Sequence, residues 1–213
     1  MGSEIRIERG RFARLESGEK KGGMNINPRG AIEAAWLVFF AFWIVWSFGA
    51  KRIAKGEGAA GAARRVLTVA VAWLLLNTND PRLGVLASRF RPSSSWVAWL
   101  GAAVTFVGVL FAIWARIHLG RYWSATVALK NEHKLIQSGP YARIRHPIYT
   151  GIIVAIAGSA ATIGTNAALL ALGIIGMSLW FKARKEEALL AGEFGSAFEE
   201  HRRHTGFFLP RFS

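Results

Sequence analysis

The sequence predicts an all-α, multi-pass transmembrane protein of about five spans that ends in a cytoplasmic amphipathic helix. Its 213 residues are 52% hydrophobic, and the apolar residues gather in runs instead of recurring at a helical or strand period, which is typical of helices that face lipid. Lys and Arg number 27 against 13 Asp and Glu, giving a net charge of +14. In a membrane protein this excess is expected at the cytoplasmic ends of spans and beside anionic lipid head groups.

The composition also excludes several classes of protein. A chain this hydrophobic is not disordered, and the absence of Cys excludes a disulfide scaffold, a Cys metal site and a thiol nucleophile. The positive charge alone would suggest a nucleic-acid partner, but the lipid-facing runs explain it better. We therefore expect membrane lipid as a partner, no nucleic acid and no metal.

Two runs, Ile32–Ala50 and Trp96–Ala115, have the length of about 20 residues that crossing the hydrocarbon requires. The second opens with two Trp residues, where an interfacial aromatic belt would lie. A third run, Val66–Leu76, is shorter and follows Arg64-Arg65. It either spans by recruiting neighbours such as Ala62 and Ala63 or re-enters on the same side, and we expect it to span.

Two further runs predict a helical hairpin. Ile148–Ile163 and Ala167–Phe181 are separated by Gly164-Thr165-Asn166, residue types that favour a tight turn between helices. At about 1.5 Å per residue the first of these runs reaches only about 24 Å. The hairpin helices are therefore expected to extend at their ends or to lie where the bilayer is thin.

The distribution of Lys and Arg predicts the orientation of the spans. Residues 51–65, 116–147 and the stretch after the last run hold 17 of them, whereas the N-terminal tail and residues 77–95 hold ten. Six of these ten precede Met24. We interpret residues 1–23 as a leader or an added extension, and without them the comparison is 17 positive residues against four. We expect the 17-residue side to be cytoplasmic, in the inner membrane of a prokaryote.

One short motif resembles a dinucleotide-binding fingerprint. Residues 56–61 read Gly-Glu-Gly-Ala-Ala-Gly, and Asp80 follows about twenty residues later. Such glycines bind a dinucleotide where a strand leads into a helix. Here an apolar run of membrane-spanning length and Lys51-Arg52 come before them. We interpret the motif as a Gly/Ala-rich cytoplasmic loop.

The long basic loop is the most informative stretch. Gly139-Pro140 predicts a turn, and Pro147 suits the first turn of the helix that begins there. Arg145, His146 and Tyr149 would then cluster at a helix N-terminus, where unpaired N–H groups and the positive dipole end favour an anion. The alternative is simple anchoring to the membrane surface by Arg and Tyr.

The C-terminal stretch predicts one further helix face. If the last span continues as a helix, five residues spaced by 3, 4, 4 and 3 positions share one face of it. This mainly apolar stripe consists of Glu187, Leu190, Phe194, Phe198 and His201. Glu186 would lie toward the polar side. A carboxylate on the buried face needs a partner, and the candidates are Arg145, His146, Arg184 or a ligand. The alternatives are a Glu187 that reaches water and a His201 that only packs.

These residues carry a resemblance to a known family. The run from Gly120 to Gly151 with its GPY and RHPIYTG motifs, the later EE, LL and FG pairs and the closing Phe-Leu-Pro resemble the isoprenylcysteine carboxyl methyltransferase family. The resemblance covers roughly the C-terminal half. It implies transmembrane helices whose last hairpin and C-terminal segment enclose S-adenosylmethionine, without a Rossmann domain, and it divides the chain into N-terminal transmembrane helices over 24–115 and a catalytic region over 116–213.

The resemblance also implies the site. The positions that match the family's cofactor pocket are His133, Leu135, Gly139, Tyr141, His146, Tyr149, Glu186 and Glu187. His201, on the same face as Glu187, completes the cofactor-binding candidates, although it and Phe198 stand where many relatives carry Tyr. The residue chemistry adds Arg145 and Arg184 as the catalytic candidates that would hold an acceptor carboxylate, because a guanidinium matches a carboxylate in fork geometry. The alternative is that they bind the carboxylate of the cofactor itself.

The chemistry fits these residue types. Methyl transfer from a sulfonium to a carboxylate is an in-line displacement that needs no general base, so positioning supplies most of the gain. A Tyr ring can face the sulfonium, and Glu186 or Glu187 can take the ribose hydroxyls or the ammonium. We expect a lipophilic small-molecule or lipidated acceptor. Three alternatives stay open: phospholipid N-methylation, an NADPH-dependent sterol-type reductase of shared architecture, and a membrane protein that is not an enzyme.

Overall fold

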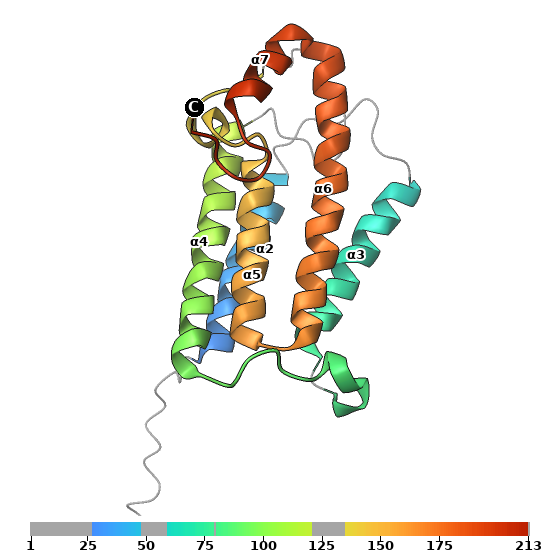
Figure 1. Cartoon of the computed structure of the whole chain (residues 1–213), viewed down its shortest axis with the longest axis vertical. Helices are drawn as coiled ribbons and strands as arrows, with labels where there is room; N and C mark the ends of the chain where they lie inside the picture. The colour runs from blue at the N-terminus through green and yellow to red at the C-terminus, as the bar shows by residue number, and fades with distance from the viewer. Residues whose placement is uncertain (1–26, 48–58, 79, 121–134, 213) are drawn as a thin grey trace, which may run out of the picture.

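A computed structural model describes residues 27–47, 59–78, 80–120 and 135–212, and this part of the chain is helical without a β-sheet. Five long helices stand side by side (Figure 1). They are α2 (Pro28–Ser47), α3 (Ala59–Asn77), α4 (Ser95–Leu119), α5 (Pro147–Ile163) and α6 (Asn166–Phe194). A short helix, α7 (Ser196–His204), and two 3-10 turns, η1 (Pro81–Leu86) and η3 (Gly139–Ala142), complete the elements. The predicted all-α fold is confirmed.

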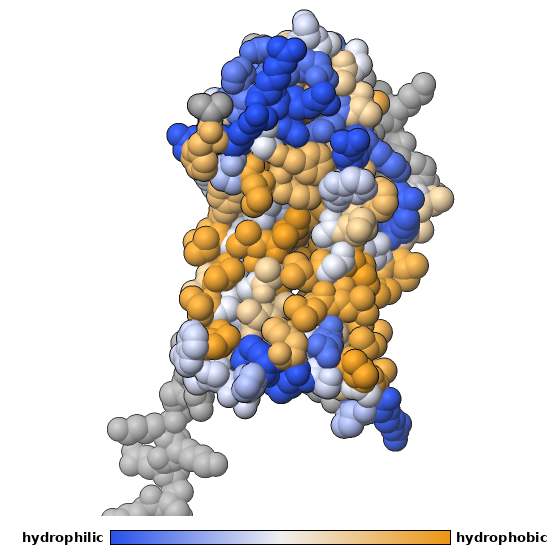
Figure 2. Space-filling view, viewed as in Figure 1, coloured by the Kyte–Doolittle hydropathy of each residue, from blue (hydrophilic) through white to orange (hydrophobic). Residues whose placement is uncertain are grey.

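The surface has the form of a membrane protein. An apolar band crosses the middle of the molecule and polar surface covers both ends (Figure 2). Within the described residues, three helices are long and apolar enough to cross a membrane: α2 over Pro28–Trp46, α4 and α6. α5 is apolar but shorter, with 17 residues. The chain is therefore an integral, multi-pass membrane protein.

The third predicted run is longer in the structure than in the sequence reading. α3 starts at Ala59 and contains 19 residues, a length of about 28 Å at 1.5 Å per residue. It packs along α6 through Ala72, Ala171 and Ile175. The run thus recruits its N-terminal neighbours and forms a single helix. Among the described helices, however, α3 is not one of those apolar enough over 18 residues to count as a membrane span, so its spanning stays a prediction.

Close packing of α4 on α5 forms the centre of the bundle. Glycines on both helices recur every seven residues, at 101 and 108 on α4 and at 151 and 158 on α5, so that they form a continuous seam. A Cβ added to Gly101 would lie 2.7 Å from the Gly158 carbonyl oxygen, and one added to Gly158 would lie 2.5 Å from the Thr105 nitrogen. Only glycine lets the two backbones approach this closely.

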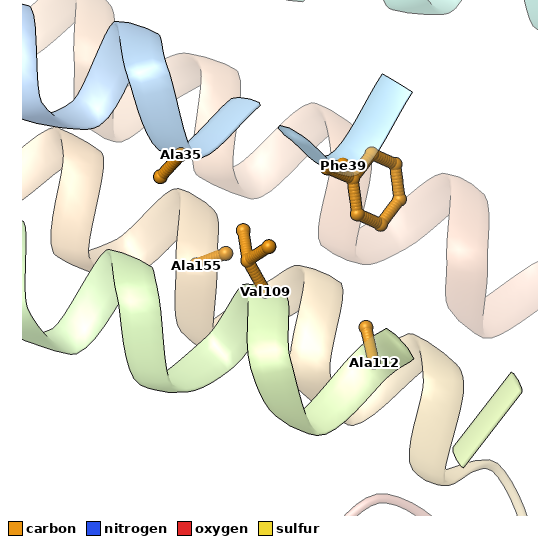
Figure 3. Close-up of a cluster of buried hydrophobic side chains, with 5 residues drawn as sticks. All are labelled: Ala35, Phe39, Val109, Ala112 and Ala155. Atoms are coloured by element: carbon orange, nitrogen blue, oxygen red, sulfur yellow. The ribbon is translucent and has the colours of Figure 1, made fainter. Parts of the chain in front are cut away.

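α2 covers the same pair from one side. Its Ala35 and Phe39 pack with Val109, Ala112 and Ala155 of α4 and α5 (Figure 3). A polar link lies inside this apolar contact, because the Trp36 indole Nε1 donates to the Ser159 Oγ at 3.0 Å. The Trp36 indole and the Ser159 hydroxyl thus satisfy each other, which a low-dielectric interior favours.

The α5–α6 hairpin forms the turn that its sequence predicts. Gly164 caps α5 in the left-handed region with φ of 77°, and Thr165 caps α6 by accepting from the Ala168 nitrogen at 3.3 Å. The segment before α4 covers the turn, since the Asn166 Nδ2 donates to the Val85 carbonyl at 3.0 Å and Arg91 donates to the Ala161 and Thr162 carbonyls. Arg91 thereby caps the C-terminus of α5.

The last span continues as a helix beyond Phe181, as predicted, and α6 reaches Phe194. The predicted continuous helix face from Glu187 to His201 is wrong, because the helix is broken at Gly195, whose φ is 50°. A positive φ is readily adopted by glycine and cannot continue an α-helix. The stretch from Glu187 to His201 is therefore two helices, and α7 turns back toward α5 (Figure 1). The separate amphipathic helix has only nine residues.

Candidate active site

The site begins at the N-terminus of α5. The turn η3 contains Pro140 at its start, and Pro147 occupies the first turn of α5 with His146 as the N-cap residue. Both prolines fix φ and lack an N–H donor that would go unpaired there. The predicted turn and helix start are confirmed, so the side chains of residues 145–149 gather at one end of the bundle.

A C-terminal strap, residues 205–211, lies across this helix start. Gly206 is the centre of the contact: its nitrogen donates to the Arg143 carbonyl at 3.0 Å, and its carbonyl accepts from the Arg145 nitrogen at 2.9 Å. The His146 nitrogen donates to the Phe207 carbonyl at 3.3 Å. These bonds hold the strap as a short parallel partner of residues 143–146, and they fix the orientation of the side chains between them.

Two carboxylates of α6 face the residues of α5. The Arg145 Nε lies 2.5 Å from the Glu187 Oε1, and the His146 Nε2 lies 3.3 Å from the same oxygen. The Tyr149 hydroxyl donates to the Glu186 Oε1 at 2.6 Å. The helical hairpin thus brings together five residues that the sequence places about forty positions apart.

Glu186 differs from its expected placement. The sequence puts it toward the polar side of the helix, but the structure turns it toward α5, with 23% of its side chain exposed. Its other oxygen lies 3.7 Å from the His146 Nδ1. Glu186 and Glu187 therefore contact both ring nitrogens of one imidazole, which orients the ring.

Aromatic rings enclose the imidazole. His146 stacks on Tyr149 with ring centroids 5.6 Å apart and planes 4° apart, and Phe207 meets it edge-on at 5.0 Å. The Lys182 Nζ lies 5.3 Å from the centre of the Tyr149 ring. The rings pack around the imidazole, and the Glu187 side chain beside it is only 8% exposed, so charged contacts to Glu187 are stronger than they would be in water.

Tyr141 lies under the same site. Its hydroxyl donates to the Ala115 carbonyl at 3.4 Å, and burial together with the Glu186 charge raises the pKa of its phenol. It is thus a neutral donor at physiological pH. Gly139 is needed for the fold of the turn, because its φ is 57° and an added Cβ would lie 2.6 Å from the His118 ring.

Other predicted residues have separate positions. Arg184 is exposed on α6, with its guanidinium 5.9 Å from the centre of the Trp180 ring. His201 is buried on α7, where its carbonyl accepts from the Thr205 hydroxyl at 2.6 Å. Leu135 is half-buried at the start of the last described segment, and His133 lies outside the described residues. The structure brings neither Leu135 nor the His201 ring into a polar contact with the carboxylate pair among the contacts described.

An open cleft of about 600 Å³ borders the carboxylate pair. Its lining combines α6, α7 and the strap and consists of Arg145, Arg184, Glu187, Glu199, Arg202, Arg203, Thr205, Gly206, Phe207 and Arg211. Both catalytic candidates are among these residues. The cleft can hold an anion, because five guanidinium groups surround it. Across the part of the chain that the structure describes, no group of three or more His, Asp or Glu is arranged to hold a metal ion.

Some residues of the site escaped the sequence reading. Lys182 stands one turn before Glu186 on the same helix, a spacing that would have indicated it. Phe207 lies in the closing segment, whose position across α5 has no local signal because it depends on the turn at Gly195. His118 contacts the Ser138 hydroxyl at 2.9 Å, a pairing across the long loop that spacing cannot predict.

Comparison with known proteins confirms the resemblance. Residues 100–192 match the model of the "Isoprenylcysteine carboxyl methyltransferase (ICMT) family". A nickel-cobalt-cadmium resistance protein, NccN, of Alcaligenes xylosoxydans xylosoxydans is 35% identical over 135 residues, which are 61% of each chain. A protein-S-isoprenylcysteine O-methyltransferase of Schizosaccharomyces pombe is 31% identical over 45% of this chain and 42% of its own length.

A solved structure shares the fold. The eukaryotic intramembrane Ras methyltransferase ICMT aligns with a TM-score of 0.51 and 19% sequence identity, over 70% of this chain and 52% of that one. At this level of identity the likeness concerns the fold. The chain spans about three fifths of the length of the first curated relatives that it matches.

Proposed function

Residues 100–192 match the isoprenylcysteine carboxyl methyltransferase family, and from this match we propose that the protein transfers a methyl group from S-adenosylmethionine to the carboxylate of a lipophilic acceptor. The observation that carries the proposal is the meeting of the two motif segments, in which Arg145 and His146 contact Glu187 and Tyr149 contacts Glu186. A hairpin that only supported the fold would not need charged and aromatic groups where the start of α5 meets α6.

The residues present fit the cofactor. Two carboxylates, one guanidinium, one imidazole and one phenol lie together, and each carboxylate has more acceptor positions than its described partners use. Glu186 and Glu187 would bind ribose hydroxyls or the ammonium of the methionine moiety. The aromatic faces of Tyr149 and Tyr141 would favour a sulfonium by about 0.5–2 kcal/mol. The cofactor supplies the activated methyl group.

Arg145 and Arg184 would divide the work of holding anions. The Arg145 guanidinium is engaged by Glu187 and by the Arg202 and Thr205 carbonyls, which suits a role in holding the Glu187 carboxylate and the strap. Arg184 is exposed at the cleft and is the better cation for an incoming carboxylate. Since the nucleophile is already ionised, these residues need only orient it and exclude water.

The acceptor would enter from the bilayer. Trp180 and Phe181 of α6 are exposed one turn below Arg184, so the apolar band reaches the cleft. A lipophilic acceptor is concentrated in lipid, and its carboxylate would lie at the level of the arginines. We place the site on the cytoplasmic face of a prokaryotic inner membrane because most Lys and Arg outside residues 1–23 gather at this end.

A tritiated-methyl assay tests the proposal. The detergent-solubilised chain is incubated with labelled S-adenosylmethionine and, in parallel, a prenylcysteine analogue, phosphatidylethanolamine and a water-soluble acid. We expect base-labile counts in the prenylcysteine fraction, because a methyl ester hydrolyses in base. Base-stable counts confined to the phospholipid would instead assign N-methylation. In Glu187→Gln the counts should fall, because a carboxylate proposed to bind the cofactor is removed. Glu193→Gln is its matched control, since Glu193 is exposed on the same helix, and it should keep them.

A further inference from the structure

The open cleft carries more positive charge than its own carboxylates balance. Five arginines and two glutamates line it. Both carboxylates have an arginine within the lining: Arg145 lies 2.5 Å from Glu187 and Arg202 lies 2.8 Å from Glu199. The other three guanidinium groups of the lining form no described ion pair with these two carboxylates. They belong to Arg184, Arg203 and Arg211.

Two of these arginines belong to other elements than Arg184, which lies on α6. Arg203 belongs to α7, and its 3.7 Å contact with Glu200 is between side chains that are 76% and 62% exposed, so this contact stabilises little and leaves the charge available. Arg211 belongs to the strap, where its backbone nitrogen donates to the Arg143 carbonyl at 3.1 Å. The backbones that carry both guanidinium groups are thus held in place while the side chains are exposed.

The surroundings of the cleft place it at the height of lipid head groups. Leu209 and Phe212 flank Arg211 and are 78% and 73% exposed. On the other wall the exposed rings of Trp180 and Phe181 precede Arg184. Figure 2 shows the polar cap over α7 directly above the apolar band. Exposed aromatic and apolar side chains next to arginines are typical of the membrane interface.

We propose that this cleft binds the phosphate of an anionic membrane phospholipid through Arg203 and Arg211. A guanidinium fork matches phosphate oxygens in bidentate geometry, and the exposed Leu209 and Phe212 would lie against the acyl chains of the same leaflet. A free phosphate would use the arginines but not the apolar side chains, so the membrane is the source that the surroundings favour. This lipid site uses other arginines than Arg184, and its readout does not depend on methyl transfer.

Competitive lipid retention tests the site. The full chain is reconstituted in nanodiscs that contain phosphatidylcholine and a minority of phosphatidylglycerol, then released in mild detergent, and the retained lipids are measured by native mass spectrometry. We expect phosphatidylglycerol to be enriched over its share in the disc. In Arg203→Gln/Arg211→Gln the enrichment falls about tenfold, since each charge near the surface contributes to anionic-lipid binding.

Matched variants separate a site from general attraction. Lys185→Gln/Arg82→Gln removes the same charge from exposed positions outside the cleft and should retain the enrichment. Arg203→Lys/Arg211→Lys keeps the charge and should retain most of it. An equal loss in the Lys185→Gln/Arg82→Gln control, no enrichment in the unaltered chain, or displacement of the lipid by inorganic phosphate at equal concentration would each overturn the proposal.

Discussion

Glu187 is the residue on which the site depends. Its side chain is only 8% exposed, and a buried carboxylate is costly unless charged or hydrogen-bonding groups satisfy it. The sequence reading expected a partner among Arg145, His146 and Arg184, and the structure places the first two on one carboxylate oxygen. Arg184 instead faces the cleft. Spacing along α6 could indicate the burial, but the choice of partner depends on how α5 starts.

Removing Arg145 should destabilise the folded protein. Arg145→Gln leaves Glu187 buried beside His146 alone and releases the carbonyls of Arg202 and Thr205. We expect the free energy of unfolding to fall by about 3 kcal/mol, the usual effect of breaking a buried ion pair. Thermal unfolding in detergent, with Lys185→Gln as an exposed control on α6, measures the change. If the two variants unfold at the same temperature, the pair does not stabilise the fold.

His201 should make stability depend on pH. Burial, with smaller contributions from Arg145 and His204, lowers the pKa of its imidazole. Above about pH 6.5 the ring is neutral in both folded and unfolded states. Below that value the unfolded chain binds a proton that the folded protein resists, so the free energy of unfolding decreases until the pH passes the folded-state pKa.

The test is a pair of thermal unfolding series between pH 7 and pH 5 in the unaltered chain and in His201→Gln. Between pH 7 and pH 5 the melting temperature should fall less in the variant than in the unaltered chain, because one group that takes up a proton on unfolding has been removed. Lys185→Gln is the control because Lys185 is exposed on α6 and is not among the groups that lower the pKa of His201. A steeper decline in His201→Gln than in the unaltered chain would contradict the burial of a neutral ring.

At the scale of helices, the apolar runs predicted which helices exist better than where each helix begins and ends. The hairpin turn could be predicted from the sequence because Gly164 caps the end of α5 and Thr165 caps the start of α6. The break at Gly195 did not follow, because a glycine within a helical pattern is compatible with both continuation and a stop, and tertiary contacts of α7 decide between them. The strap across α5 depends on that break. The sequence thus indicated most site residues but not the segment that covers them.

The glycine seam between α4 and α5 also lay outside the sequence reading, since no short motif reveals which of several helices will face each other. Gly108→Ala should destabilise the bundle, because the new Cβ would lie 2.6 Å from the Gly151 carbonyl oxygen. We expect a loss of about 1–3 kcal/mol from overpacking. Gly173→Ala on α6 is the matched control, as nothing lies within 4 Å of its added Cβ.

Thermal unfolding in detergent again gives the comparison. Gly173→Ala should keep or slightly raise the melting temperature, because Ala is the better helix former. Gly108→Ala should lower it. Equal melting temperatures in the two variants would mean that α4 and α5 are not in backbone contact at this level of the bundle.

At the scale of the whole molecule, one end carries the proposed site. The carboxylate pair, the strap and the cleft all lie at the end where α4 finishes and α5 starts (Figure 1). The hairpin turn and η1 lie at the opposite end. Counting Lys and Arg predicts that the chemical end faces the cytoplasm, since 17 of the residues belong to it and only four lie opposite once residues 1–23 are set aside.

Cysteine labelling measures this orientation. The chain has no native Cys, and Ser138 and Asn27 are exposed positions at the two ends. In intact cells an impermeant thiol reagent should label Asn27→Cys and not Ser138→Cys, whereas both should react after the membrane is opened. Labelling of Ser138→Cys with protection of Asn27→Cys would reverse the orientation.

Titration of the detergent-solubilised chain with S-adenosylmethionine, followed by calorimetry, tests the central claim most directly. The account predicts saturable binding that weakens by about 1–3 kcal/mol, roughly 5- to 150-fold, in Glu187→Gln when a charge-assisted bond is lost. Glu193→Gln should bind as the unaltered chain does. An unaltered chain that binds NADPH but not S-adenosylmethionine, or a Glu187→Gln variant with unchanged affinity, would contradict the assignment of this carboxylate pair to the cofactor.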